Sequence, residues 1–180
     1  MHVFSEYLTE SPSFVQQLQA QVRPLDRLVA STRSTFVPQF TIPQLELREM
    51  SPGYKSKPLG LWYGIGTSWV EWAEDEGFGI GQFFYKIKIR REKMLWITPD
   101  NLAAVSRRYP GRDAIGDRVI HWQKVAEEYS GVEFNPYKKY VNKATWNSMW
   151  YSGVDVPSGC IWKSDAITSA EPVYVDLPKK

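Results

Sequence analysis

Two segments rich in aromatic residues and glycine, far apart in the chain, constrain the fold more than any other feature. They cover residues 57–69 and residues 150–162. With one tryptophan just beyond the first segment, they hold five of the eight tryptophans, namely Trp62, Trp69, Trp72, Trp150 and Trp162. Each segment joins a strand-like run to residues that favour tight turns. Aromatic walls beside glycines, which let a ligand approach the backbone, are typical of a small-molecule pocket, and they are equally compatible with a tryptophan-rich core.

Length and composition indicate an ordinary globular protein. A chain of 180 residues suits one domain, with or without an N-terminal extension. Hydrophobic residues make up 43% and charged residues 23%, which is typical of soluble domains. The formal net charge of +2 is too small to indicate a nucleic-acid-binding protein by itself. Basic residues do gather locally, for example at Arg107, Arg108 and Arg112, and such a cluster fits either a solvated face or an anionic partner.

The scarcity of cysteine and histidine excludes several kinds of site. Cys160 is the only cysteine, so an intrachain disulfide cannot form and a reducing compartment is expected. Only two histidines occur, which argues against a His-based metal cluster, and we expect no metal. We find no secretory leader and no apolar stretch near the ~20 residues that a membrane span needs. The expectation is therefore a soluble, cytoplasmic protein without membrane contact.

Short helices and short strands alternate along the chain. Four prolines between residues 38 and 58 prevent long helices there. We predict helices that begin at Ser11, at Ser68 with a capping box to Glu71, at Thr98 and near Asp117. Alternating or apolar runs predict strands over residues 45–50, 60–63, 83–89, 94–97, 131–134 and 160–163. A polar, lysine-bearing loop is predicted between the last two strands, over residues 135–158. This mixture indicates the α+β class.

Few residues are placed to perform chemistry. A serine or cysteine hydrolase lacks its base, since only His121 is available and it lies in an apolar helical pattern. Gly64-Ile65-Gly66 lacks the third glycine of a dinucleotide fingerprint, and no Walker sequence occurs. Three features are left: Arg48 on an early strand, the aromatic strand Leu61-Trp62-Tyr63-Gly64 followed by Thr67 and Ser68, and Asp155 before the last strand.

This order resembles the ADP-ribosyltransferase family, especially its small phage and bacterial members. The resemblance covers about residues 45–168 and ends with Asp155 placed before Gly159-Cys160-Ile161-Trp162. It implies an α+β fold with a split antiparallel β-sheet core and flanking helices. It also implies a helical or extended N-terminal segment, 1–44, and a catalytic domain, 45–180. The expected activity is mono-ADP-ribosyl transfer from NAD, as substrate, to a protein or nucleic-acid acceptor, with release of nicotinamide.

The resemblance also implies a role for each residue. Asp155 is the expected catalytic acid, because a carboxylate stabilises the oxocarbenium-like ribose that forms when nicotinamide leaves. Arg48 is the expected anchor of NAD, and Thr67 and Ser68 are the hydroxyl contacts. Trp62 or Tyr63 forms the nicotinamide wall, and strand alternation lets only one of them face the ligand.

Each assignment has an alternative. Arg48 also fits a surface ion pair, Asp155 also fits a turn residue, and Glu133 is the rival acid. Gly153 stands where arginine-modifying members carry Glu or Gln, which argues against an arginine acceptor. The acceptor is expected at three lysines of the long loop, Lys138, Lys139 and Lys143, a pattern that suits a nucleic-acid strand. The alternative function is a non-catalytic phage or host-defence binding protein that uses its aromatic surface to inhibit a partner.

Overall fold

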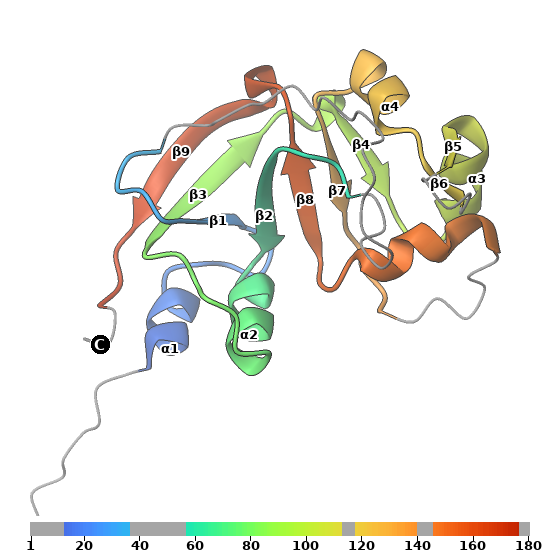
Figure 1. Ribbon diagram of the computed structural model, residues 1–180. Helices are drawn as coiled ribbons and strands as arrows, with labels where there is room; N and C mark the ends of the chain where they lie inside the picture. The colour runs from blue at the N-terminus through green and yellow to red at the C-terminus, as the bar shows by residue number, and fades with distance from the viewer. Residues whose placement is uncertain (1–12, 37–56, 113–117, 140–145, 177–180) are drawn as a thin grey trace, which may run out of the picture.

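A seven-stranded mixed sheet forms the centre of the structure (Figure 1). The computed structural model describes residues 13–36, 57–112, 118–139 and 146–176. The strands are β1 (Arg27–Ser31), β2 (Leu61–Ile65), β3 (Phe83–Ile89), β4 (Met94–Ile97), β7 (Gly131–Phe134), β8 (Ser158–Ile161) and β9 (Ile167–Val173). Their order across the sheet is β4-β7-β8-β2-β1-β3-β9. A separate two-stranded ribbon pairs β5 (Pro110–Arg112) with β6 (Arg118–Ile120).

The α+β class is confirmed, but the sheet is not antiparallel throughout. β4 and β7 pair in parallel, whereas all other neighbouring strands of the seven are antiparallel. The chain between β4 and β7 passes through α3 (Leu102–Arg108), the β5–β6 ribbon and α4 (Trp122–Glu128). Such a crossover returns the chain to the sheet in its original direction, which is why this one pair is parallel.

β1 is a central strand that the sequence analysis did not predict. It lies between β2 and β3, so part of the N-terminal segment 1–44 belongs to the same sheet as the rest of the chain. Its run Leu28-Val29-Ala30 is apolar on both faces of the sheet and therefore shows no alternation. β9 was also missed, because this edge strand mixes polar with apolar residues and only Val173 in it is buried.

Strand alternation divides the sheet into two faces with different coverings. The Trp62 face carries Leu28, Trp62, Gly64, Phe134 and Cys160, and the Tyr63 face carries Arg27, Val29, Tyr63, Glu133 and Ile161. α1 (Phe14–Gln19) and α2 (Ser68–Asp75) pack against one half of the Trp62 face, through Leu18 and Val70. α3, α4 and the 3-10 helix η2 (Trp146–Gly153) pack against the other half. Figure 1 shows these two groups of helices at separate places along the sheet.

α2 begins at Ser68 as predicted, whereas the starts of the other helices differ from the prediction. α1 starts after Ser13, which forms a capping box with Gln16; the predicted cap Ser11 lies outside the described residues. α2 follows Thr67 and has no capping box, since the Ser68 hydroxyl bonds to carbonyl groups instead. α4 starts only at Trp122, because residues 118–120 form β6. Two shorter 3-10 turns complete the elements, η1 (Arg91–Lys93) and η3 (Ser164–Ala166). Within the described ranges, none of the helices has the length and apolar character needed to cross a membrane.

Much of the second aromatic segment belongs to the core. Trp150 and Trp162 are 5% and 1% exposed, so the core interpretation holds for both. Their rings lie 6.0 and 6.3 Å from the Trp122 ring of α4. Residues 57–69 differ, since Trp62 and Trp69 are only half-buried. The two segments therefore have different roles, and a ligand-accessible aromatic wall exists only at the first.

Candidate functional site

A cavity of about 310 Å³ opens on the Trp62 face, between α2 and the loop that enters β8. Trp62 from β2 and Trp69 from α2 contribute its aromatic walls, and Asp155 and Lys57 contribute its charges. Three of the residues that the sequence singled out, Trp62, Tyr63 and Asp155, thus line one cavity. Its volume suits a ligand the size of a nucleoside rather than a whole dinucleotide.

Strand pairing brings Asp155 to Trp62. β2 and β8 are antiparallel, with Trp62 opposite Cys160 and Gly64 opposite Ser158, so the loop before β8 ends beside β2. The Pro157 carbonyl accepts hydrogen bonds from the Ile65 N–H at 3.0 Å and from the Ser68 hydroxyl at 3.2 Å. The loop is therefore tied to the start of α2.

Glycine at position 64 allows this close approach of α2. A Cβ on Gly64 would lie 2.8 Å from the Trp69 Cβ, a distance that side chains do not tolerate. Gly64 thus brings the helix, rather than a ligand, close to the strand.

The site already holds a cation from the protein itself. The Lys57 Nζ lies 3.1 Å from the Asp155 Oδ2 and 5.8 Å from the centre of the Trp62 ring. The indole is fixed in place, since its Nε1 donates to the Pro58 carbonyl at 3.2 Å and its ring stacks on Phe134. Both charged side chains are nearly half exposed, so this ion pair is weak and can be exchanged. A carboxylate beside an aromatic face is a binding site for a positively charged group.

The other predicted contacts lie elsewhere. The Thr67 hydroxyl donates to the Glu71 carboxylate at 2.6 Å, and the Ser68 hydroxyl donates to the Ile65 carbonyl at 2.8 Å, so both serve the start of α2. Lys138 and Lys139 are exposed on the segment after β7. Arg48 and Lys143 lie outside the described residues.

Tyr63 points to the opposite face of the sheet, as alternation predicts, and there it belongs to a buried charged network. Glu133 is fully buried, and Arg27 binds it with two hydrogen bonds, from Nε at 2.6 Å and from Nη2 at 3.0 Å. The Tyr63 hydroxyl donates to the same carboxylate at 2.7 Å. Burial works to lower the pKa of Arg27, but the hydrogen bond and charge of Glu133 outweigh it and raise that pKa. Glu133, the rival acid, is thus held in a buried ion pair on the face of the sheet opposite Trp62.

Arg27 is the residue of this network that the sequence analysis missed. A signal was present: Glu133 stands in the otherwise apolar run Gly131-Val132-Glu133-Phe134, and a buried carboxylate requires a cationic partner. The partner could not be chosen from sequence, because Arg27 lies 106 residues away.

We expect the free energy of unfolding to fall as the pH rises above about 10. Burial, and next the charge of Glu133, raise the pKa of the Tyr63 phenol well above its usual value. The unfolded tyrosine ionises near pH 10, so above that pH the unfolded state releases a proton that the folded state keeps. Each such group lowers stability by at most about 1.4 kcal/mol per pH unit until its folded pKa is reached. Urea denaturation between pH 8 and pH 11 measures this loss.

Tyr63→Phe is the matched control for this pH dependence. It removes the phenol, so its stability should fall less steeply above pH 10 than that of the wild type. Burial also raises the pKa of the Cys160 thiol, and this contribution is common to both proteins and begins at lower pH. Identical slopes in the two proteins would contradict a role for the Tyr63 proton.

Comparison of the chain with models of known protein families, with curated proteins and with solved structures finds no match. The described residues also contain no group of three or more His, Cys, Asp or Glu side chains that could hold a metal ion. What the site can do therefore has to be argued from its own geometry.

Proposed function

We propose that the chain is an NAD-dependent mono-ADP-ribosyltransferase whose nicotinamide–ribose site is the cavity between β2, α2 and the loop before β8. One observation carries the proposal: Trp62 and Asp155 together hold a positive charge, at present that of Lys57, in a cavity of nucleoside size. The nicotinamide of NAD is itself a cationic ring attached to a ribose, so it matches this combination of groups.

The chemistry follows from the placement of these groups. The bond between ribose C1′ and the nicotinamide nitrogen breaks, and its electron pair leaves with nicotinamide as a neutral molecule. Positive charge then develops on the ribose, where the Asp155 carboxylate stabilises it. A nucleophile of the acceptor, or water, forms the new bond to C1′ and releases its proton to solvent. Lys57 is displaced when NAD binds, and its ammonium marks the position of the ligand's charge.

The order of the elements supports the same assignment. The resemblance expects an aromatic strand followed by a helix, then further strands and helices, and finally a loop with an acid before the next strand. β2, α2, the elements from β3 to β7, and the Asp155 loop before β8 occur in this order. On this basis we assign the finer fold, an ADP-ribosyltransferase-like core. Arg48 stays the proposed anchor of NAD, and Lys138, Lys139 and Lys143 the proposed contacts to a protein or nucleic-acid acceptor.

We expect Asp155→Asn to lower the rate of nicotinamide release from NAD about 10²–10³-fold, because it removes the group that stabilises the developing charge. Its thermal stability should change little, since the side chain is 41% exposed. Chromatography of nicotinamide after incubation with NAD, with and without a candidate acceptor, measures the effect.

Asp165→Asn is the matched control. Asp165 forms an ion pair of the same length, 3.1 Å, with Lys93, and both side chains are about as exposed as those of Asp155 and Lys57. Turnover should be unchanged in this variant. Undiminished turnover in Asp155→Asn would remove Asp155 from the mechanism. A wild-type protein that binds NAD but releases no nicotinamide would favour the non-catalytic binding protein instead.

A further inference from the structure

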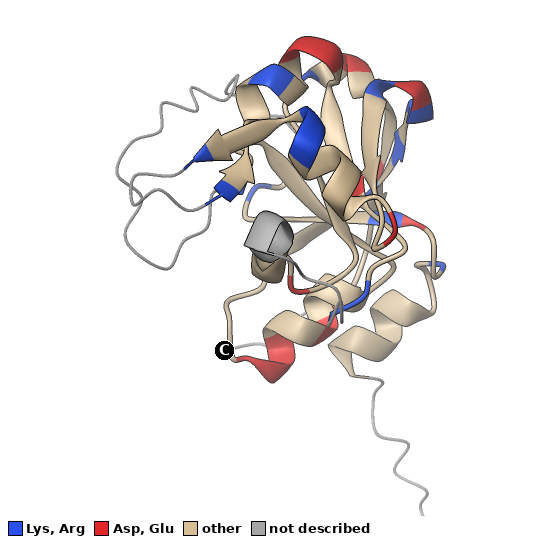
Figure 2. Cartoon of the chain, turned by 90° about the vertical axis from the view of Figure 1, so that its right-hand side faces the viewer, with Lys and Arg blue, Asp and Glu red and all other residues tan. Residues whose placement is uncertain are grey.

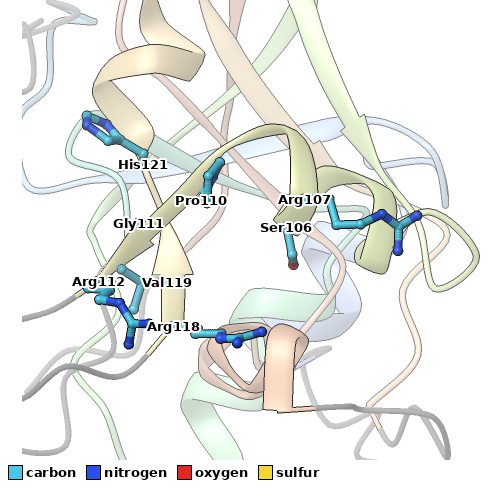
Figure 3. Close-up of a pocket in the computed structure, with 8 residues that line it drawn as sticks. All are labelled: Ser106, Arg107, Pro110, Gly111, Arg112, Arg118, Val119 and His121. Atoms are coloured by element: carbon cyan, nitrogen blue, oxygen red, sulfur yellow. The ribbon is translucent and has the colours of Figure 1, made fainter.

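The cavity of Trp62 and Asp155 differs from a second, larger cavity in the way its charges are arranged. The second cavity, of about 640 Å³, lies between α3 and the β5–β6 ribbon (Figure 3). Its described lining residues include three arginines and no acidic residue, and Figure 2 shows basic residues on α3 and at the ends of both ribbon strands. In the cavity of Trp62, by contrast, the basic side chain of Lys57 lies against a carboxylate. There the chain itself occupies a place that suits a cationic ligand.

The backbone beside Lys57 is held at the edge of the cavity. Pro58, the next residue, is buried, and its carbonyl accepts hydrogen bonds from the Trp62 Nε1 at 3.2 Å and from the Cys160 thiol at 3.6 Å. The lysine stem passes Gly153, where an added Cβ would lie 3.5 Å from the Lys57 Cε. The ammonium group is thus attached to a fixed backbone position beside the cavity, which gives it a high effective concentration inside.

The contact that the ammonium group makes is nevertheless weak enough to be broken. The Lys57 Nζ lies 3.1 Å from the Asp155 Oδ2, but the two side chains are 46% and 41% exposed, so water screens the pair. The flexible stem of Lys57 lets the ammonium group turn out into solvent without movement of the backbone. The ion pair is therefore closed in the free protein and opens at little cost.

A ligand that enters the cavity has to compete with this ammonium group. A positively charged ring gives Asp155 a new counter-charge and Trp62 a new cation, so it replaces both contacts of Lys57. A neutral ring replaces neither of them, and the loss of the ion pair opposes its binding. Once the bond to the ribose has broken, nicotinamide is neutral, and the ammonium group can return to its place.

We propose that Lys57 is an internal competitor of the ligand, an autoinhibitory contact that a cationic ring displaces and that re-forms beside the neutral product. The identity of the ring as nicotinamide rests on the proposed function, whereas the competition rests only on the contacts of Lys57. Lys57 thus weakens the binding of NAD and favours the release of nicotinamide. Removing its charge should tighten the binding of a cation, which is the opposite of what the loss of a ligand-binding residue does.

Quenching of tryptophan fluorescence by 1-methylnicotinamide tests this competition. The probe has the ring and the charge of the nicotinamide in NAD but no ribose, so it has no bond for the proposed reaction to break. Lys57→Gln should bind it about two- to fivefold more tightly than the wild type, the factor that corresponds to an exposed ion pair. Lys57→Arg keeps the charge and should stay close to the wild type. Neutral nicotinamide should bind the wild type more weakly than the cation does.

Lys93→Gln is the matched control. The ion pair of Lys93 with Asp165 has the same length, 3.1 Å, and the Lys93 side chain has the same exposed fraction as that of Lys57, 46%. Lys93 is not among the described residues that line the cavity, so its variant should bind the probe as the wild type does. Unchanged or weaker binding in Lys57→Gln, or no binding of the cation to any of the proteins, would overturn the proposal.

Release of nicotinamide from NAD, measured in parallel, separates this inference from the proposed function. The KM for NAD should fall in Lys57→Gln by a factor similar to that for the probe. If none of the proteins releases nicotinamide while Lys57→Gln still binds the cation more tightly, the proposed enzyme activity is wrong and the internal competitor stands. If NAD is turned over but Lys57→Gln binds the cation like the wild type, only the internal competitor is wrong.

Discussion

Replacing Gly159 with alanine is expected to leave little folded protein. Gly159 on β8 stands between Tyr63 on β2 and Glu133 on β7, so the phenol ring crosses directly above it to reach the carboxylate. A Cβ at this position would lie 2.3 Å from the Tyr63 Cζ and hydroxyl oxygen, and 2.7 Å from the Val132 carbonyl. Overpacking costs about 1–3 kcal/mol, and the lost hydrogen bond to a charged group adds about 1.5–3 kcal/mol. Soluble yield and the midpoint of urea denaturation measure this effect.

Gly79→Ala provides the comparison. A Cβ on Gly79 meets no atom within 4 Å, and its backbone is not left-handed, so stability should be nearly unchanged. If Gly159→Ala unfolds at the same urea concentration as Gly79→Ala, the Tyr63 ring does not cross β8 as described.

Glu133→Leu is expected to destabilise the protein by about 3–5 kcal/mol, because it leaves the Arg27 guanidinium partly buried without its counter-charge. The Tyr63 hydroxyl loses its acceptor at the same time. Denaturation with urea at pH 7 gives the free energy of unfolding of each variant.

Two further variants test whether the cost arises from the unpaired charge. Arg27→Met/Glu133→Leu should recover most of the loss, since an apolar pair replaces a buried ion pair at little net cost. Asp155→Ala breaks an exposed ion pair and should cost only about 0–1 kcal/mol. A similar small cost for Glu133→Leu would contradict a structural role of this network.

Local sequence patterns were sufficient to predict the strands that have one polar face or one strongly aromatic face. β2, β3, β4 and β7 lie where alternation and apolar runs predicted them. β1 was not predicted, because both of its faces are covered and its apolar residues therefore do not alternate with polar ones. Residues 118–120 were assigned to a helix because the period of Trp122, Val125 and Ala126 was extended too far toward the N-terminus, whereas pairing with β5 makes them a strand.

The sequence predicted individual residues of the candidate site but not all of their partners. Trp62 and Asp155 were identified from residue type and position in the chain order, and the structure brings them into one cavity. Lys57 and Arg27 were not foreseen, because each owes its role to a partner about a hundred residues away, Asp155 and Glu133 respectively. Such pairs depend on which strands are neighbours in the sheet, and local sequence patterns do not indicate the order of the strands.

The position of β8 in the sheet determines how late in synthesis the sheet can be completed. β8 is the single strand that joins β4 and β7 on one side to β2, β1, β3 and β9 on the other. Until the ribosome has released residues 158–161, the nascent chain contains two partial sheets with open edges at β7 and β2. The wall of Trp62 and the carboxylate of Asp155 are also apart until then. The two partial sheets therefore stay separate until most of the chain has emerged, and the cavity of Trp62 and Asp155 forms in the same late step that joins them.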